Sequence, residues 1–84
     1  MSKDIFNKLN LHQRIKTLYV DGQFVTDIRY YKYKINLYLL ENYFVEVFYH
    51  HRDDRIEKVE ILEDKSSRMK FYIDQIKLPK GLLS

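Results

Sequence analysis

The strongest indication of the fold class lies in residues 32–49, which read Lys-Tyr-Lys-Ile-Asn-Leu-Tyr-Leu-Leu-Glu-Asn-Tyr-Phe-Val-Glu-Val-Phe-Tyr. This stretch contains two runs in which apolar side chains recur at every second position. A period of two is typical of strands that bury one face. The apolar positions are Tyr33, Ile35, Leu37 and Leu39 in the first run and Tyr43, Val45, Val47 and Tyr49 in the second. The stretch therefore predicts two consecutive antiparallel strands.

The turn between these strands sets which side chains share a face. A two-residue turn at 41–42 would pair Leu37 with Glu46 and bury a carboxylate. A three-residue loop over 40–42 pairs Leu37 with Val45 instead, and it places Asn42 at a left-handed position, which asparagine tolerates well. We therefore expect the three-residue loop.

The neighbouring strands extend the same sheet. A turn at 31–32 would set Ile28 against Ile35 and Phe24 against Leu39. A five-residue loop over 51–55 would set Val47 against Val59 and Val45 against Ile61. The sheet is then a four-stranded antiparallel meander with strands at about 23–30, 33–39, 43–50 and 56–63.

Helical spacing of apolar residues flanks the sheet on both sides. Residues 4–21 form the first predicted helix, with a break near Asn10 and a left-handed cap at Gly22. Residues 66–77 form the second, capped by Ser66 or Ser67, and Pro79 makes 78–84 an extended tail. We expect residues 1–84 to be a single α+β domain with both helices on one face of the sheet.

Composition excludes several classes of protein. The 84 residues carry 15 Lys and Arg against 12 Asp and Glu, a net charge of +3, and 45% are hydrophobic. The chain has no cysteine, which removes disulfide frameworks, thiolate metal sites and cysteine nucleophiles. It starts without the apolar run of a signal peptide and contains no run long enough to span a bilayer. A cytoplasmic location is expected.

The predicted outer face of the sheet is the first candidate functional surface. It places aromatic and apolar side chains next to rows of opposite charge, a pattern that suits a two-fold contact with a second copy. Scattered cross-strand pairs on a solvated face are the alternative. The expected interface residues are Tyr38, Phe44, Phe48 and Leu62, with Arg29, Lys34, Glu46 and Lys58 beside them. We expect a non-enzymatic interaction module that forms a homodimer or binds another protein.

Two polar groups could carry other chemistry. Asp27, Glu46 and Glu60 lie on adjacent predicted strands, where they could hold a hard cation, but basic neighbours favour salt bridges. His50 and His51 are adjacent and should point to opposite sides of a strand, so an ordinary hairpin loop is favoured over a metal site. With two glycines, the chain has no phosphate-binding loop. We expect no catalytic residues, no metal and no cofactor.

Residues 29–34 alternate aromatic rings with cations, which suits single-stranded DNA or RNA. The predicted register leaves mainly Arg29, Tyr31, Lys32 and Lys34 exposed. Nucleic acid binding through the Arg29 and Lys34 row is the second functional expectation.

The run 35–49 together with Arg-Ile-Glu-Lys-Val-Glu-Ile-Leu at 55–62 resembles a group of short bacterial proteins. The similar stretch covers roughly residues 17–76, and it implies a small bacterial cytoplasmic domain without an assigned activity. The chain also resembles, less closely, RelE-type toxin ribonucleases. It lacks a strand before the first helix, and few basic residues follow the last helix (Lys77 and Lys80).

Overall fold

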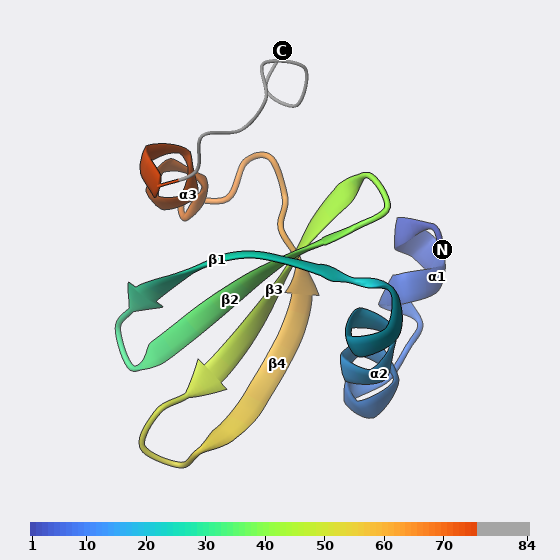
Figure 1. Cartoon of the computed structure of the whole chain (residues 1–84), viewed down its shortest axis with the longest axis horizontal. Coiled ribbons are helices and arrows are strands. Elements are labelled where there is room, and N and C mark those ends of the chain that lie inside the picture. The colour runs from blue at the N-terminus through green and yellow to red at the C-terminus, as the bar shows by residue number, and fades with distance from the viewer. Residues whose placement is uncertain (76–84) are drawn as a thin grey trace.

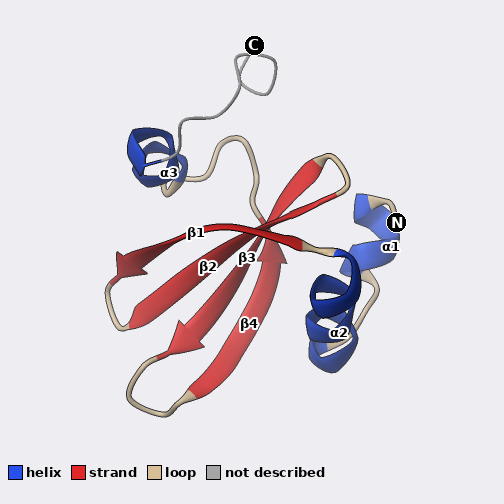
Figure 2. Ribbon diagram, viewed as in Figure 1, coloured by secondary structure: helices blue, strands red, loops and turns tan. Residues whose placement is uncertain are grey.

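The computed structural model describes residues 1–75, with a four-stranded antiparallel sheet in the order β1-β2-β3-β4 (Figures 1 and 2). The elements are α1 (Lys3–Asn7), α2 (Leu11–Asp21), β1 (Gln23–Tyr30), β2 (Tyr33–Leu40), β3 (Tyr43–His50), β4 (Arg55–Ile61) and α3 (Met69–Gln75). The predicted α+β class, the meander and the flanking helices are confirmed.

The N-terminal helical region is broken at Asn10, as its spacing suggested. The Asn10 side chain accepts a hydrogen bond from the Gln13 amide at 2.9 Å, and the Gln13 side chain accepts one from the Asn10 amide at 2.9 Å. This reciprocal pair is a capping box, which satisfies amides that the first turn of a helix leaves without partners. It fixes the start of α2 and therefore the bend after α1.

The hairpin between β2 and β3 differs from the prediction. The connection is the two-residue turn Glu41–Asn42, so Leu37 pairs with Glu46 and Leu39 with Phe44. The left-handed residue is Glu41, at φ 54°, rather than Asn42. The expectation of a three-residue loop was wrong because it treated Glu46 as a carboxylate without a partner.

A shift of one residue turns every side chain of a strand to the other face. The helices consequently lie on opposite faces of the sheet, and the expectation that both pack on one face was wrong. Phe6 of α1 and Leu18 of α2 pack with Leu40, Tyr43, Val45, Val47, Val59 and Ile61. Tyr72 of α3 packs with Ile28, Ile35, Leu37, Phe48 and Leu62. Figure 1 shows α3 well separated from α1 and α2.

The other two hairpins largely follow the predicted register. Ile28 pairs with Ile35, and Val47 pairs with Val59. An irregularity between Phe24 and Thr26 shifts Phe24 from Leu39 to Tyr38. A second irregularity, between Phe48 and Tyr49, lets His50 pair directly with Arg55, so the β3–β4 loop spans four residues and not five.

The segment after β4 leads to α3. The Ser66 hydroxyl accepts a hydrogen bond from the Arg68 amide at 3.2 Å, in the turn that precedes the helix. The predicted end of this helix at residues 76–77 and the predicted tail at 78–84 lie outside the described residues. Within residues 1–75, no helix has the length and apolar character needed to cross a membrane.

Candidate functional site

The predicted outer-face interface does not exist as a surface. Glu46, Phe48 and Leu62 expose 0%, 2% and 5% of their area, because α3 covers them. The remaining predicted residues are divided between two faces: Phe44 and Lys58 share the α3 face, while Arg29, Lys34 and Tyr38 lie on the α1–α2 face. The one-residue change in register accounts for both results.

Glu46 instead anchors α3 to the sheet. Both carboxylate oxygens accept hydrogen bonds from Arg68, from Nε and from Nη2, each at 2.8 Å. The Tyr72 hydroxyl donates a third bond to Oε2 at 2.7 Å. The guanidinium also lies 5.2 Å from the centroid of the Phe48 ring. We call Glu46, Arg68 and Tyr72 the α3 anchor.

The α3 anchor changes the titration of its members. The hydrogen bonds to Glu46 raise the pKa of Arg68. Burial, followed by the hydrogen bond to Glu46, raises the pKa of Tyr72. Both groups therefore keep their protons at neutral pH, and the arrangement has the chemistry of a buried structural ion pair.

The three carboxylates that suggested a cation site do not lie on the same face of the sheet. Glu46 pairs with Glu60 across β3 and β4, but Asp27 is on the opposite face. Glu60 lies 3.9 Å from Lys58, and Asp27 lies 4.0 Å from Lys34. No group of three His, Cys, Asp or Glu side chains in residues 1–75 is arranged to hold a metal ion.

A cationic hollow at one end of the sheet brings together residues from two hairpins. The β1–β2 turn and the β3–β4 loop meet at the same end of the meander (Figure 1). The hollow has a volume of about 380 Å³. It is lined by Arg29, Tyr31, Lys32, His50, His51 and Arg52. We call it the cationic hollow.

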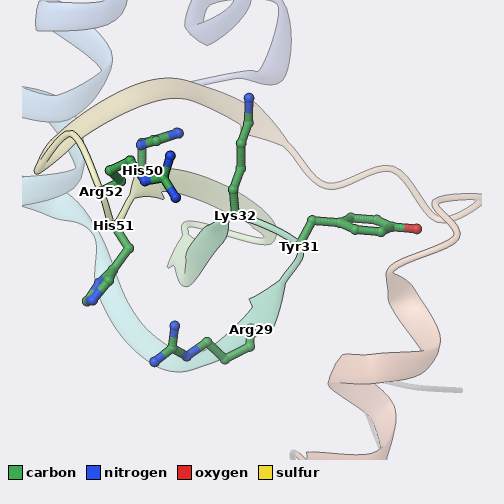
Figure 3. Close-up of a pocket in the computed structure, with 6 residues that line it drawn as sticks. All are labelled: Arg29, Tyr31, Lys32, His50, His51 and Arg52. Atoms are coloured by element: carbon green, nitrogen blue, oxygen red, sulfur yellow. The ribbon is translucent and has the colours of Figure 1, made fainter.

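The side chains around the cationic hollow have distinct directions (Figure 3). Arg29 and His51 extend toward the same side, whereas Arg52 and His50 lie close together. The Tyr31 ring points away from the other five and is 87% exposed. Its backbone is left-handed, at φ 55°, which is uncommon outside glycine. The ring makes a T-shaped contact with Tyr30, with centroids 4.6 Å apart.

Asp53 of the β3–β4 loop already has a cationic partner, because its carboxylate lies 3.8 Å from Arg55. The Asp53 amide also donates to Nδ1 of His50 at 3.1 Å, so this nitrogen acts as an acceptor. Among residues 1–75, no carboxylate lies within 4 Å of the charged groups of Arg29, Lys32 or Arg52. The hollow therefore presents three cations that have no ion-pair partner within this distance.

The cationic hollow overlaps only partly with the predicted basic row. Of the predicted row, Arg29 lines the hollow and Lys34 does not. Tyr31 and Lys32, which the predicted register left exposed in the same segment, also line it. The sequence does not assign His50, His51 and Arg52 to this site, because their pattern favours an ordinary hairpin loop. The meander topology contains the missing signal, since it places the first and third connections at the same end of the sheet.

No family model, no curated protein and no solved structure matches this chain. The candidate function therefore depends on the geometry of this molecule alone.

Proposed function

We propose that the protein binds single-stranded nucleic acid, with backbone phosphates in the cationic hollow. One observation carries the proposal: three cations, none with a carboxylate within 4 Å, line a single hollow whose rim includes an exposed tyrosine. A polyanion would supply the missing negative charge, and release of its counterions would favour binding.

Arg29 and Arg52 suit phosphate oxygens, because a planar guanidinium can donate two parallel hydrogen bonds to one group. Lys32 adds a third cation from the β1–β2 turn. Histidine Nε2–H groups are further donors available to a phosphate.

Tyr31 is the feature that favours a single strand over a duplex. A base can stack on an exposed ring only when its face is free, as in single strands. The Tyr31 ring is directed away from the hollow, so a base stacks on the ring while the adjoining phosphates lie in the hollow. Aromatic rings combined with cations are typical of proteins that bind single strands without strong sequence preference.

The test is the binding of a fluorescein-labelled oligothymidylate or oligouridylate, followed by anisotropy at low salt and then at rising salt. Replacing both Lys32 and Arg52 by Glu should weaken binding by about tenfold or more and flatten the dependence on salt. The matched control exchanges two exposed lysines elsewhere, Lys8→Glu with Lys16→Glu, which leaves the net charge equal to that of the test variant.

The ring is tested separately. Tyr31→Ala should weaken binding by about fivefold or more, because stacking contributes ~1–3 kcal/mol per base, and Tyr31→Phe should retain binding. The absence of binding at low salt would refute the proposal. An equal loss in the Lys8 and Lys16 control would refute the assignment to the hollow.

A further inference from the structure

We infer that β1 pairs edge to edge with β1 of a second copy, in an antiparallel register centred on Ile28. The inference is independent of nucleic acid binding. It depends on four observations: the difference between the two sheet edges, the regular part of β1, its charge pattern and the apolar side chains beside it.

The two edge strands of the sheet, β1 and β4, differ in how far the rest of the chain covers them. At the β4 edge, Nη1 of Arg14 donates to the Val59 carbonyl at 2.5 Å. The same guanidinium also donates to the carbonyls of Leu9 and Asn7, which ties the bend between α1 and α2 to this edge. The β4 edge is thereby partly covered. The β1 edge has no neighbouring strand in residues 1–75, and such an edge is a template for pairing with another chain.

The regular part of β1 defines a register. The irregularity between Phe24 and Thr26 interrupts the ladder, and from Thr26 to Tyr30 every residue pairs in sequence with β2. The middle residue of this segment is Ile28, which is buried. A two-fold axis through Ile28 therefore pairs the whole regular segment with the same segment of the second copy, and the irregular part of β1 lies outside the pairing.

The charges on β1 are self-complementary about that axis. Asp27 and Arg29 flank Ile28, both exposed and both on the α1–α2 face. The two-fold register places Asp27 opposite Arg29 of the partner subunit, and it does so twice in each dimer. Within one chain, Arg29 lies directly opposite Lys34, a like charge, and such pairs are unfavourable across a sheet. Asp27 of the same chain lies 4.0 Å from Lys34, whereas Arg29 has no carboxylate within 4 Å in residues 1–75. A carboxylate from the partner would relieve this repulsion.

The α3 face supplies apolar side chains near the same edge. A two-fold axis that pairs antiparallel edge strands is perpendicular to the sheet, so both α3 helices lie on one side of the seam. Phe71 of α3 contacts Tyr30 of β1, with ring centroids 6.1 Å apart, yet it remains 39% exposed. The neighbouring Ile73 is also exposed. In the dimer, Tyr30 lies opposite Thr26 of the partner subunit. The side chain of Thr26 of the partner subunit then covers part of the apolar surface next to Tyr30.

Arg29 lies both on this edge and at the rim of the cationic hollow. A guanidinium has five N–H donors, enough to contact a carboxylate of the partner and a phosphate. Dimer formation and nucleic acid binding are therefore compatible, and they are measured separately.

The experiment measures the mass of the full chain in solution by size-exclusion chromatography with light scattering, over a concentration series and without nucleic acid. The unaltered protein should approach twice the mass of the chain at high concentration. Asp27→Arg and Arg29→Asp should each raise the dimer dissociation constant by about tenfold or more, because each places like charges opposite one another at two symmetric positions. The double variant, Asp27→Arg with Arg29→Asp, should restore the dimer.

The matched control is Lys16→Asp, which makes the same change of charge as Arg29→Asp but lies on α2, and it should leave the dimer intact. Circular dichroism checks that each variant is folded. Backbone amide exchange in residues 26–30 should slow as concentration rises. A monomer at every concentration would overturn the inference, as would a dimer that neither single charge change weakens or that the double variant fails to restore.

Discussion

Gly22 occupies a position at which the backbone of Leu18 leaves too little space for a Cβ atom. The residue joins α2 to β1 with φ −81° and ψ 156°, an extended conformation, so the left-handed cap expected from the sequence was wrong. Its amide donates to the Leu18 carbonyl at 2.9 Å, which closes the last turn of α2. A Cβ at this position would lie 2.7 Å from the Leu18 carbonyl oxygen and 3.0 Å from the Leu18 Cα. Glycine is therefore needed here for space.

Gly22→Ala should destabilise the fold by about 1–3 kcal/mol, because the backbone must move to accommodate the extra carbon. Urea unfolding followed by circular dichroism measures the change in the free energy of unfolding. Gln23→Ala, at the exposed next position, is the control and should have little effect. A Gly22→Ala variant as stable as the unaltered protein would contradict the steric account.

At the scale of the elements, α3 depends on one buried charge. Seven residues of this helix lie in the part of the chain that the structure describes, and a helical segment of this length is not stable in isolation. Its attachment combines the packing of Tyr72 with the ion pair between Arg68 and Glu46. Glu46 has no exposed surface, so loss of its partner would leave a carboxylate without compensation under the helix.

Arg68→Leu should lower the free energy of unfolding by about 3 kcal/mol, because it leaves the buried Glu46 carboxylate without its cation. Replacing both members of a buried ion pair by apolar residues costs less than removing one of them. The double variant, Glu46→Leu with Arg68→Leu, should be more stable than Arg68→Leu alone. The control is Lys70→Leu, which removes an exposed charge from the same helix and should change stability by less than about 0.5 kcal/mol. If Arg68→Leu behaved like Lys70→Leu, the α3 anchor would have no role in stability.

At the scale of the whole molecule, tyrosine hydroxyls link stability to alkaline pH. The pKa values of Tyr33, Tyr43, Tyr49 and Tyr72 are all raised above the ordinary 10.0. Burial is the main cause for Tyr43 and Tyr72. Hydrogen bonds to Glu57 and Asp54 are the main causes for Tyr33 and Tyr49. The folded chain therefore retains these protons at a pH where the unfolded chain releases them.

Below pH 10, these four tyrosines should therefore add no pH dependence to the free energy of unfolding. As the pH rises above 10, the free energy of unfolding should fall, because the unfolded chain loses these protons first. Urea unfolding at a series of values from about pH 8 to about pH 11 tests this expectation. Tyr72→Phe should lower stability at neutral pH, since it removes a hydrogen bond to a charged group, and should make the alkaline decline shallower. A decline that is unchanged in Tyr72→Phe would exclude Tyr72 as a contributor.

The periodicity of the sequence alone determined the elements and their order. Alternation in residues 32–49 predicted β2 and β3, and Asn10 marked the break between α1 and α2, because strand pleat and helix capping are local properties. The pairings of Ile28 with Ile35 and of Val47 with Val59 also followed from local patterns.

Tertiary structure decided which face each strand presents, and with it the candidate site. The partners of Glu46 are Arg68 and Tyr72, 22 and 26 residues further along the chain. No local pattern shows that α3 will bring a guanidinium to that carboxylate. Because the carboxylate is compensated there, the two-residue turn is allowed, Phe48 becomes core, and the predicted docking face is lost. Of the exposed features that remain, the β1 edge follows from the strand order, and the cationic hollow follows from two hairpins that lie at one end of the sheet.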